Sequence, residues 1–526
     1  MNHEMIFSAK AASKPLVPYW NFCAGAGRAN EGLRAGWRDH LKTAVTHCGF
    51  RNLRFHGLLH DDMFVCRKSG PNLIFNWQYI DDLTDALLAA GVRPFVEFGF
   101  FPRDLAGESD VRCFWWQAHV TPLDDYRDWT KLIDALVRHW IRRYGLLEVK
   151  SWYFEVWNEP NLPFFFNGPR ERYFELYRDT AGTIKNIDAA LKVGGPATSN
   201  FVPDGRFDGG AEDRSKLMPL SQRTLEGGDW RPIWIPEFFD YCHRNQLPVD
   251  FISTHPYPSD FAIDDGNQGA MHVRGARATT DDLRWLRRAV DESPFPRAEI
   301  HLTEWSSSPS DKDYSHDFPQ AAAFVVKANL ESSGLVDSLS YWTFTDVFEE
   351  HGAGDTAFHG GFGLINFQGI VKPTFHSYRF LNLLGTEEIF RSDGFVATRD
   401  KDRGSLVAVA YHYPEECRFA PRLNKSFAEA SEDLATGSPC STRVQIRDLE
   451  PGSAFAIEVV DAEAGFVGAV WHQIGSPSSP SPAQTELLKD RAWATKKWVV
   501  TADEDGVLNL PLNLAPWSIA CIREVR

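Results

Sequence analysis

The chain lacks the short motifs that mark the commonest metal and phosphate sites. Its eight cysteines include no CxxC pair and no zinc-ribbon spacing. Neither GxxxxGK(S/T) nor HExxH occurs, and the glycine run 24–30 has Asn30 where a dinucleotide-binding GxGxxG needs its third glycine. We therefore interpret that run as a loop and expect no cofactor and no metal.

Long apolar runs and an excess of basic residues are also missing. The N-terminus has no apolar stretch of about 7 to 15 residues behind a basic start, and no run of about 18 apolar residues occurs. We therefore expect a cytoplasmic protein with reduced thiols and no membrane segment. Lys and Arg number 55 against 71 Asp and Glu, and the net charge of −16 repels polyanions and argues against a nucleic-acid partner.

The sequence does contain a repeated alternation of short β-branched or aromatic runs with longer amphipathic runs, over about its first 385 residues. The alternation predicts eight strands, each followed by a candidate helix. The predicted strands are Tyr19–Phe22, Asn52–Phe55, Arg93–Phe98, Trp152–Trp157, Val193–Gly195, Phe251–Thr254, Glu299–Thr303 and Ser338–Phe344.

Glycine closes most of the clearest helices, as expected of the residue just past a helix end. Eight βα units in about 370 residues predict a (β/α)8 barrel, with a doubly wound open sheet as the alternative. The clearest helices are Trp77–Ala90, Asp124–Tyr144, Thr280–Asp291, Ala321–Ser333 and Thr374–Leu384.

After Gly385 the sequence pattern changes to short runs of alternating apolar and polar residues separated by turn residues. It predicts an antiparallel β-sandwich as a C-terminal accessory domain. We place the barrel at residues 15–385 and the β domain at 386–526, with residues 1–14 as a candidate extra strand of the latter. The segment Gly475–Pro482 is rich in Ser and Pro and predicts an extended loop.

Two predicted barrel strands deliver a glutamate to the end where (β/α)8 enzymes place their chemistry. Strand four runs into Asn158-Glu159-Pro160, and strand seven runs into Glu304-Trp305. Because strands four and seven lie on opposite sides of the ring, we expect the two carboxyl groups to face one another. One could protonate a departing oxygen while the other attacks an anomeric carbon or activates water.

Other interpretations of these residues stay open at this point. A single Glu at a strand end is usually a solvated charge, and the joint occurrence of two carries the argument. An aldolase or isomerase on the same barrel would need a Lys nucleophile or a phosphate site, whereas the eighth strand end is acidic and aromatic. A non-catalytic carbohydrate-binding protein is the alternative outside enzymes.

The segments FEVWNEPNL (154–162) and LTEW (302–305) resemble the clan of retaining (β/α)8 glycosidases. Segments 54–63, 254–258 and 341–350 narrow the resemblance to glycoside hydrolase family 39, the β-xylosidase and α-L-iduronidase family. The resemblance implies that Glu159 is the general acid/base, that Glu304 is the nucleophile, and that Asn158 binds the sugar 2-hydroxyl.

Further residues in the matching segments are weaker candidates for substrate binding. His56 and His255 would contact sugar hydroxyls or the nucleophile, although a buried, hydrogen-bonded His is an equal alternative. Aromatic faces suit sugar rings as well as protein cores, so packing explains the aromatic candidates equally well. Around the sugar at the cleavage point (the −1 sugar), the remaining candidates are Tyr257, Trp342, Glu349 and Glu350. Glu349 and Glu350 are adjacent, so they need not both point inward. Trp305 or the cluster 114–116 could supply faces on which a sugar stacks.

The expected activity is therefore that of a retaining exo-glycosidase, with xylose release from the non-reducing end of short xylo-oligosaccharides or aryl xylosides as the first choice. An α-L-arabinosidase, a β-glucosidase or β-galactosidase, and an α-L-iduronidase-like enzyme are the alternatives within the family. The sequence is compatible with a monomer or a homo-oligomer.

Overall fold

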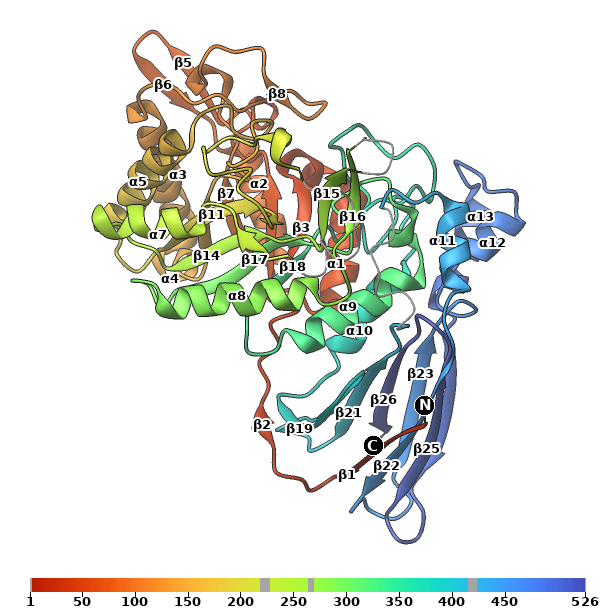
Figure 1. The fold of residues 1–526 in the computed structure, drawn as a ribbon. Helices are drawn as coiled ribbons and strands as arrows, with labels where there is room; N and C mark the ends of the chain where they lie inside the picture. Colours follow the sequence, from red (N-terminus) through yellow and green to blue (C-terminus); the bar gives the residue numbers. More distant parts are fainter. Residues whose placement is uncertain (1, 218–227, 264–268, 415–422, 526) are drawn as a thin grey trace.

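The computed structural model describes residues 2–217, 228–263, 269–414 and 423–525, and its centre is a closed barrel of eight parallel strands (Figure 1). The closed ring confirms the predicted barrel and excludes an open sheet. Around the ring, each strand pairs in parallel with the next along the chain. The barrel strands are β3 (Cys23–Arg28), β4 (Asn52–His56), β7 (Arg93–Phe98), β10 (Tyr153–Val156), β11 (Lys192–Ser199), β14 (Phe251–His255), β17 (Glu299–Trp305) and β18 (Ser338–Tyr341).

Helices alternate with these strands and surround the barrel (Figure 1). In the described part of the chain, none of them is long and apolar enough to cross a membrane. The helices are α1 (Ala35–Cys48), α2 (Gln78–Ala89), α3 (Arg127–Tyr144), the short α4 (Leu146–Val149), α5 (Arg170–Ile187), α7 (Ile235–Arg244), α8 (Ala278–Glu292), α9 (Pro319–Glu331) and α10 (Pro373–Leu381).

The first barrel strand lies later in the chain than predicted. The sequence pattern predicts a strand at Tyr19–Phe22 and a loop at the glycine run 24–30, but Cys23–Arg28 form β3. The buried indole of Trp342 explains why this strand has a glycine at position 25, because a Cβ atom there would lie 2.3 Å from Cε3 of Trp342. Close packing of Trp342 thus requires a strand that lacks the bulky residues by which strands are recognised.

Inside the barrel, successive inward-facing residues form layers, because alternate residues of a strand face the same side. The lowest layer is aromatic and includes Phe95, Tyr153 and Phe251. Two residues further along two of these strands, the side chains of Glu97 and Glu155 are buried, and a buried arginine, Arg54, joins them from β4. The barrel therefore becomes charged toward the carboxyl ends of its strands.

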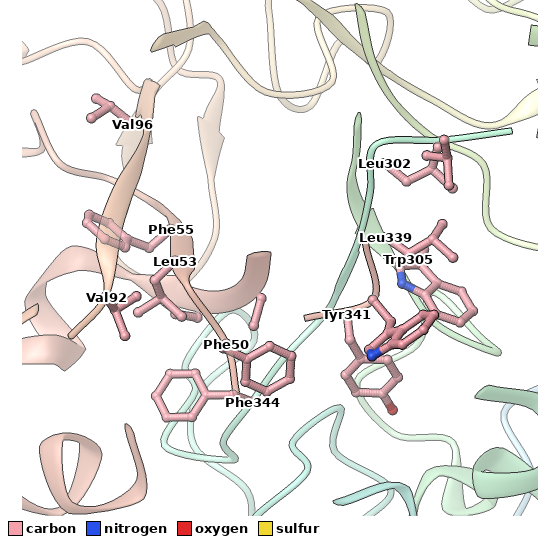
Figure 2. Close-up of a cluster of buried hydrophobic side chains, with 14 of the residues drawn as sticks. Phe50, Leu53, Phe55, Val92, Val96, Leu302, Trp305, Leu339, Tyr341 and Phe344 are labelled. Atoms are coloured by element: carbon pink, nitrogen blue, oxygen red, sulfur yellow. The ribbon is translucent and has the colours of Figure 1, made fainter. Parts of the chain in front are cut away.

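Outward-facing residues of the same strands are apolar and pack beneath the surrounding helices. Figure 2 shows part of this cluster, in which Trp305 lies beside Leu339 and Tyr341. Trp305 is fully buried and also contacts Phe324 of α9, with ring centroids 5.9 Å apart. Its indole therefore belongs to the layer between barrel and helices.

The remainder of the chain adds two packed sheets, one of which is antiparallel, in agreement with the predicted fold class. In the other sheet, β1 (Asn2–Ser8) lies parallel to β22. Buried side chains from both sheets form one hydrophobic core, among them Phe7, Phe395 and Leu510. The sheets are β2-β19-β20-β21-β26-β23-β24 and β1-β22-β25, with bounds β2 (Lys14–Pro15), β19 (Glu387–Ser392), β20 (Phe395–Arg399), β21 (Leu406–Tyr411), β22 (Cys440–Arg447), β23 (Ala454–Val460), β24 (Lys496–Thr501), β25 (Leu508–Leu514) and β26 (Ile519–Val525).

Three helices in this part were not predicted: α11 (Phe427–Leu434), α12 (Gly468–Gln473) and α13 (Pro482–Trp493). The segment expected to be an extended loop ends one residue early, because Ser481 caps α13 and Pro482 is its first residue. Trp493 at the end of α13 contacts Phe375 of α10, with ring centroids 5.4 Å apart. These helices thus connect the packed sheets to the barrel.

Short hairpins and 3-10 turns extend the loops at the carboxyl ends of the barrel strands. They surround the opening, and residues of two of them, the β8–β9 turn and η2, are described beside the site below. The hairpins are β5 (Cys66–Ser69) with β6 (Asn72–Phe75), β8 (Arg112–Cys113) with β9 (Ala118–His119), β12 (Phe201–Val202) with β13 (Arg231–Pro232) and β15 (Ser259–Ile263) with β16 (Gly269–Val273); the turns are η1 (Ala29–Leu33), η2 (Asp61–Met63), η3 (Arg103–Leu105), η4 (Arg214–Lys216) and η5 (Tyr314–Asp317).

The packing of Trp342 on β3 predicts a specific cost of enlarging Gly25. We expect Gly25→Ala to lower the free energy of unfolding by about 1–3 kcal/mol, since the added methyl overlaps a buried indole. Urea unfolding measures the change. Gly36→Ala in α1 is the matched control, because a Cβ there meets nothing within 4 Å. A Gly25→Ala variant as stable as the wild type would contradict the packing argument.

Candidate active site

Glu159 reaches the opening from a tight corner after β10. Trp157 and Glu159 both have positive φ, +75° and +44°, a conformation that costs about 1–3 kcal/mol per non-glycine residue. The neighbouring strand β11 holds the corner: the Glu159 amide donates to the carbonyl of Ala197 at 2.9 Å, and Asn161 Oδ1 accepts from the Ser199 amide at 2.8 Å. The backbone strain is therefore maintained by hydrogen bonds that fix where the carboxyl group points.

Glu304 reaches the same opening through an irregularity in β17. The register between β17 and β18 shifts between Leu302 and Trp305, so that two consecutive side chains, Thr303 and Glu304, contact the interior. Thr303 donates to Glu155 Oε1 at 2.7 Å, whereas Glu304 accepts from Arg54 at 2.7 Å. A regular strand would have turned one of these two side chains toward the helices.

Arg54 is the centre of the charged layer. Its side chain is fully buried, and it donates to Glu155 Oε2 at 2.5 Å, Glu304 Oε1 at 2.7 Å and Asn158 Oδ1 at 2.9 Å. Glu97 Oε2 lies 3.1 Å from Nη2. Burial alone would lower the pKa of Arg54, but the carboxylates of Glu155, Glu97 and Glu304 raise it above its ordinary value. The guanidinium is thus a permanent cation.

His56 adds a second positive charge beside Glu304. Its Nδ1 hydrogen-bonds Glu97, and its Nε2 lies 3.2 Å from Glu304 Oε1. Burial lowers the pKa of His56, but the charges of Glu97 and Glu304 and their hydrogen bonds outweigh it and raise the pKa to about 10. The imidazole is therefore protonated at neutral pH and donates to both carboxylates.

His255 and Tyr257 contact the two glutamates from β14 and the residues that follow it. His255 Nδ1 lies 2.9 Å from Glu159 Oε1 and 3.8 Å from Glu304 Oε2, and its Nε2 hydrogen-bonds Thr303 at 2.9 Å. Tyr257 donates to Glu304 Oε2 at 3.3 Å, and burial raises the pKa of its phenol well above the ordinary value. The phenol therefore remains a donor to the carboxylate.

The two glutamates approach closely, as expected from their places on strands four and seven of the ring. One oxygen of each, together with a ring nitrogen of His255, lies within 4.8 Å of the other two atoms. Burial would raise the pKa of Glu304, but His255, His56 and Arg54 lower it well below its ordinary range. Glu304 is therefore ionised, which is the state that a nucleophile needs.

The adjacent Glu349 and Glu350 point in different directions. Glu349 forms ion pairs with Arg28 and Arg34, away from the two catalytic candidates. Glu350 Oε1 lies 3.9 Å from His56 Nε2, and burial together with the charge of Glu304 raises the pKa of Glu350 well above normal. Glu350 is thus the member of the pair that lies beside the site.

Of the aromatic candidates for substrate binding, some lie beside the site and one lies away from it. Trp342 is nearly buried and contacts His56, with ring centroids 4.7 Å apart, so it lies beside the site. Phe114 also contacts His56, at 6.0 Å. Trp305 does not reach the opening, because it packs against α9 as described above. Its assignment to substrate binding is not supported by its position.

Four residues that hold the site together were not predicted from the sequence, namely Arg54, Glu97, Glu155 and Thr303. A signal existed for three of them, because each places a charge between apolar residues of a barrel strand. Buried charges are rare unless they are paired, so three such residues on neighbouring strands indicate a network. Thr303 carried no such signal.

Glu159, His255 and Glu304 also present the donor set of a metal site. However, Arg54 and the protonated His56 already supply positive charge to Glu304 at 2.7 and 3.2 Å. A cation in the same place would be repelled by both groups. The arrangement fits proton transfer and nucleophilic attack better than metal binding.

Comparisons with known proteins identify similar sequences and structures over nearly the whole chain. The model of Glycosyl hydrolases family 39 matches residues 3–205 and 226–509. A β-xylosidase of Geobacillus stearothermophilus is 35% identical to this chain, and the alignment covers 96% of this chain and 92% of the β-xylosidase. The α-L-iduronidase of Homo sapiens is 31% identical, and the alignment covers 93% of this chain and 73% of the iduronidase. The crystal structure of a monomeric β-xylosidase from Caulobacter crescentus superposes with a TM-score of 0.84 at 30% identity, covering 99% of each chain.

The raised pKa of His56 predicts how its contribution to stability depends on pH. A group whose pKa is higher in the folded state stabilises fully below its unfolded pKa, about 6.5, and loses that contribution as pH rises through the folded value. We therefore expect the gap in Tm between the wild type and His56→Asn to be largest below pH 6.5 and to shrink toward pH 10. Thermal unfolding across this range tests it. A gap that is constant, or that grows with pH, would show that His56 is buried neutral.

Proposed function

The chain belongs to Glycosyl hydrolases family 39, and on this premise we propose that it is a retaining exo-β-xylosidase that releases xylose from the non-reducing end of short xylo-oligosaccharides. The family membership makes it a glycoside hydrolase. Two of the similar proteins named above are called β-xylosidases and align over nearly their whole length, which supports the choice of sugar.

The close approach of Glu159 and Glu304 carries the proposal of retention. Their nearest oxygens lie within 4.8 Å, whereas inverting enzymes separate the two carboxyl groups by about 6.5–9.5 Å to admit a water. In double displacement, Glu159 protonates the glycosidic oxygen while Glu304 attacks the anomeric carbon, and the bond to the leaving group breaks. Glu159 then takes a proton from water, which displaces Glu304 and releases the sugar.

Neighbouring groups support these two roles. Arg54, His56 and Tyr257 hydrogen-bond or face Glu304, which keeps it ionised and oriented. Asn158 Oδ1 accepts from Arg54, so its amide NH2 group is oriented as a donor. We assign that donor to the 2-hydroxyl of the sugar, a contact that strengthens in the transition state.

The charges beside the site favour a neutral sugar over a uronic acid. A sugar carboxylate needs a cation, and Arg54, His56, Arg28 and Arg34 are each paired with carboxylates of the protein. Glu350, the carboxyl group beside His56, supplies no cation either. Among the described residues that surround Glu304, the net arrangement therefore disfavours the α-L-iduronide alternative. An arabinoside, glucoside or galactoside carries no such charge and is distinguished by assay.

We also propose the organisation and location of the protein. Residues 15–385 would form the catalytic unit, and residues 386–526 a β-sandwich accessory unit that β1 joins through its pairing with β22. A cytoplasmic location fits the seven described cysteines, which are free thiols; Cys417 lies outside the described residues. In that location, short imported oligosaccharides would be the substrates.

Activity assays with a nucleophile variant test the proposed function. The purified protein is assayed with aryl β-xyloside, α-arabinoside, β-glucoside, β-galactoside and α-iduronide. We expect turnover of the β-xyloside, a loss of about 1,000-fold or more in kcat for Glu304→Ala, and recovery with azide as an α-xylosyl azide. Glu171→Ala, which removes an exposed carboxylate of α5, is the matched control and should retain full activity.

Each outcome of the assays has a separate meaning. Azide rescue with a different aryl glycoside would support double displacement and would contradict the proposal that xylose is the sugar released. Full activity of Glu304→Ala would overturn the assignment of the nucleophile. Folded wild-type protein that hydrolyses none of the five glycosides would favour the non-catalytic carbohydrate-binding alternative.

A further inference from the structure

Arg28, the last residue of β3, contacts residues from three other loops at the opening of the barrel. Its side chain is nearly buried and forms an ion pair with Asp62 of η2, after β4, and another with Glu349 at 3.3 Å, after β18. Its guanidinium carbon lies 5.5 Å from the ring centre of Trp115 and 5.2 Å from that of Trp116, in the β8–β9 turn after β7. Four loops of adjacent strands therefore meet at one cation.

A backbone hydrogen bond also joins two of these loops, on the side that faces the active site. The Trp115 amide donates to the carbonyl of Glu350 at 3.0 Å, which joins the loop after β7 directly to the loop after β18. Glu349 is held by Arg28 together with Arg34, and the Trp115 amide holds the backbone of Glu350, whose carboxyl group lies 3.9 Å from His56. We call Arg28, Asp62, Trp115, Trp116 and Glu349 the Arg28 wall.

The Arg28 wall lies on one side of the nucleophile, and the acid/base lies on the other. His56, which connects the wall to the site, approaches Oε1 of Glu304, whereas Tyr257 contacts Oε2 and His255 links that side to Glu159. The acid/base marks the side where the leaving group departs. A terminal sugar on the side of Glu304 away from the leaving group would lie toward His56 and Glu350, with the wall beyond it.

We propose that the Arg28 wall closes the opening beyond the terminal sugar and that Arg28, as a positioning residue, restricts the enzyme to removing one sugar at a time. The inference rests on the proposed function and adds to it the residue that determines exo action. A guanidinium suits this position because its charge pairs with two carboxylates while its flat faces stack on indole rings. Lysine offers the charge without the planar contact.

The product formed first from a labelled oligosaccharide tests the proposal. With reducing-end-labelled xylotetraose, the wild type should give labelled xylotriose as its only first product. Arg28→Met removes the ion pairs with Asp62, Glu349 and Glu31 and the stacking on the indole rings. We expect labelled xylobiose among its first products, since a disaccharide can then occupy the opened site. KM for the aryl β-xyloside should rise by about tenfold with a smaller change in kcat, because Glu350 is positioned less well while Glu304 keeps its own partners.

Two further variants keep the test independent of a folding defect. Trp115 is 52% exposed, so Trp115→Ala should fold and should also release labelled xylobiose. Arg138→Met, which removes an exposed arginine paired with Asp134 on α3, should behave as the wild type does. Near-ultraviolet circular dichroism and Tm show which variants retain the native fold.

The outcomes separate this inference from the proposed function. Wild-type protein that trims one sugar at a time, together with folded Arg28→Met and Trp115→Ala that do the same, would overturn the role of the Arg28 wall and leave the proposed function intact. Wild-type protein that hydrolyses neither the tetraose nor the aryl xyloside would overturn the proposed function and this inference with it.

Discussion

The buried guanidinium of Arg54 is the interaction on which the site depends. A charge without water is stable only when opposite charges and hydrogen bonds replace its hydration, and Arg54 finds these on three other barrel strands, in Glu97, Glu155 and Glu304. The same contacts neutralise carboxylates that would otherwise repel one another. Because the partners come from β7, β10 and β17, the position of Glu304 is tied to the closed barrel itself.

This arrangement gives chemically identical side chains different properties. Burial raises the pKa of both Glu304 and Glu350, but Glu304 lies among Arg54, His56 and His255 and its pKa is lowered overall. Glu350 faces His56 and the charge of Glu304, and its pKa is raised. One carboxyl group is therefore kept ionised by its neighbouring cations, and the other is favoured in its neutral form by burial and by nearby negative charge.

Much of the fold and the central pair of residues could be predicted from the sequence. The strand Arg93–Phe98 was predicted with its observed bounds because it is a compact run rich in Phe and Val between clear helices. Glu159 and Glu304 were found because both follow predicted strands. The first strand was misplaced, since Trp342 demands small residues where a strand pattern would show large ones. The local sequence pattern therefore predicts a strand where burial determines which residues it contains. It fails where a side chain that is distant in the sequence determines them.

The roles of neighbouring residues were harder to predict for the same reason. Nothing in the sequence distinguishes Glu349 from Glu350, because their different directions depend on Arg28 and Arg34, more than 300 positions away. Trp305 resembled a sugar-stacking residue by its place after Glu304, yet the register shift in β17 turns it toward α9. Such assignments need the tertiary contacts that the structure supplies.

The most direct measurement of what Arg54 and its partners achieve is the stereochemistry of the first sugar released. If Glu304 is an ionised nucleophile held close to Glu159, proton NMR during the first minutes of aryl β-xyloside hydrolysis will show β-xylose before mutarotation produces the α-anomer. Initial formation of α-xylose would contradict double displacement at Glu304, because it would require direct attack by water.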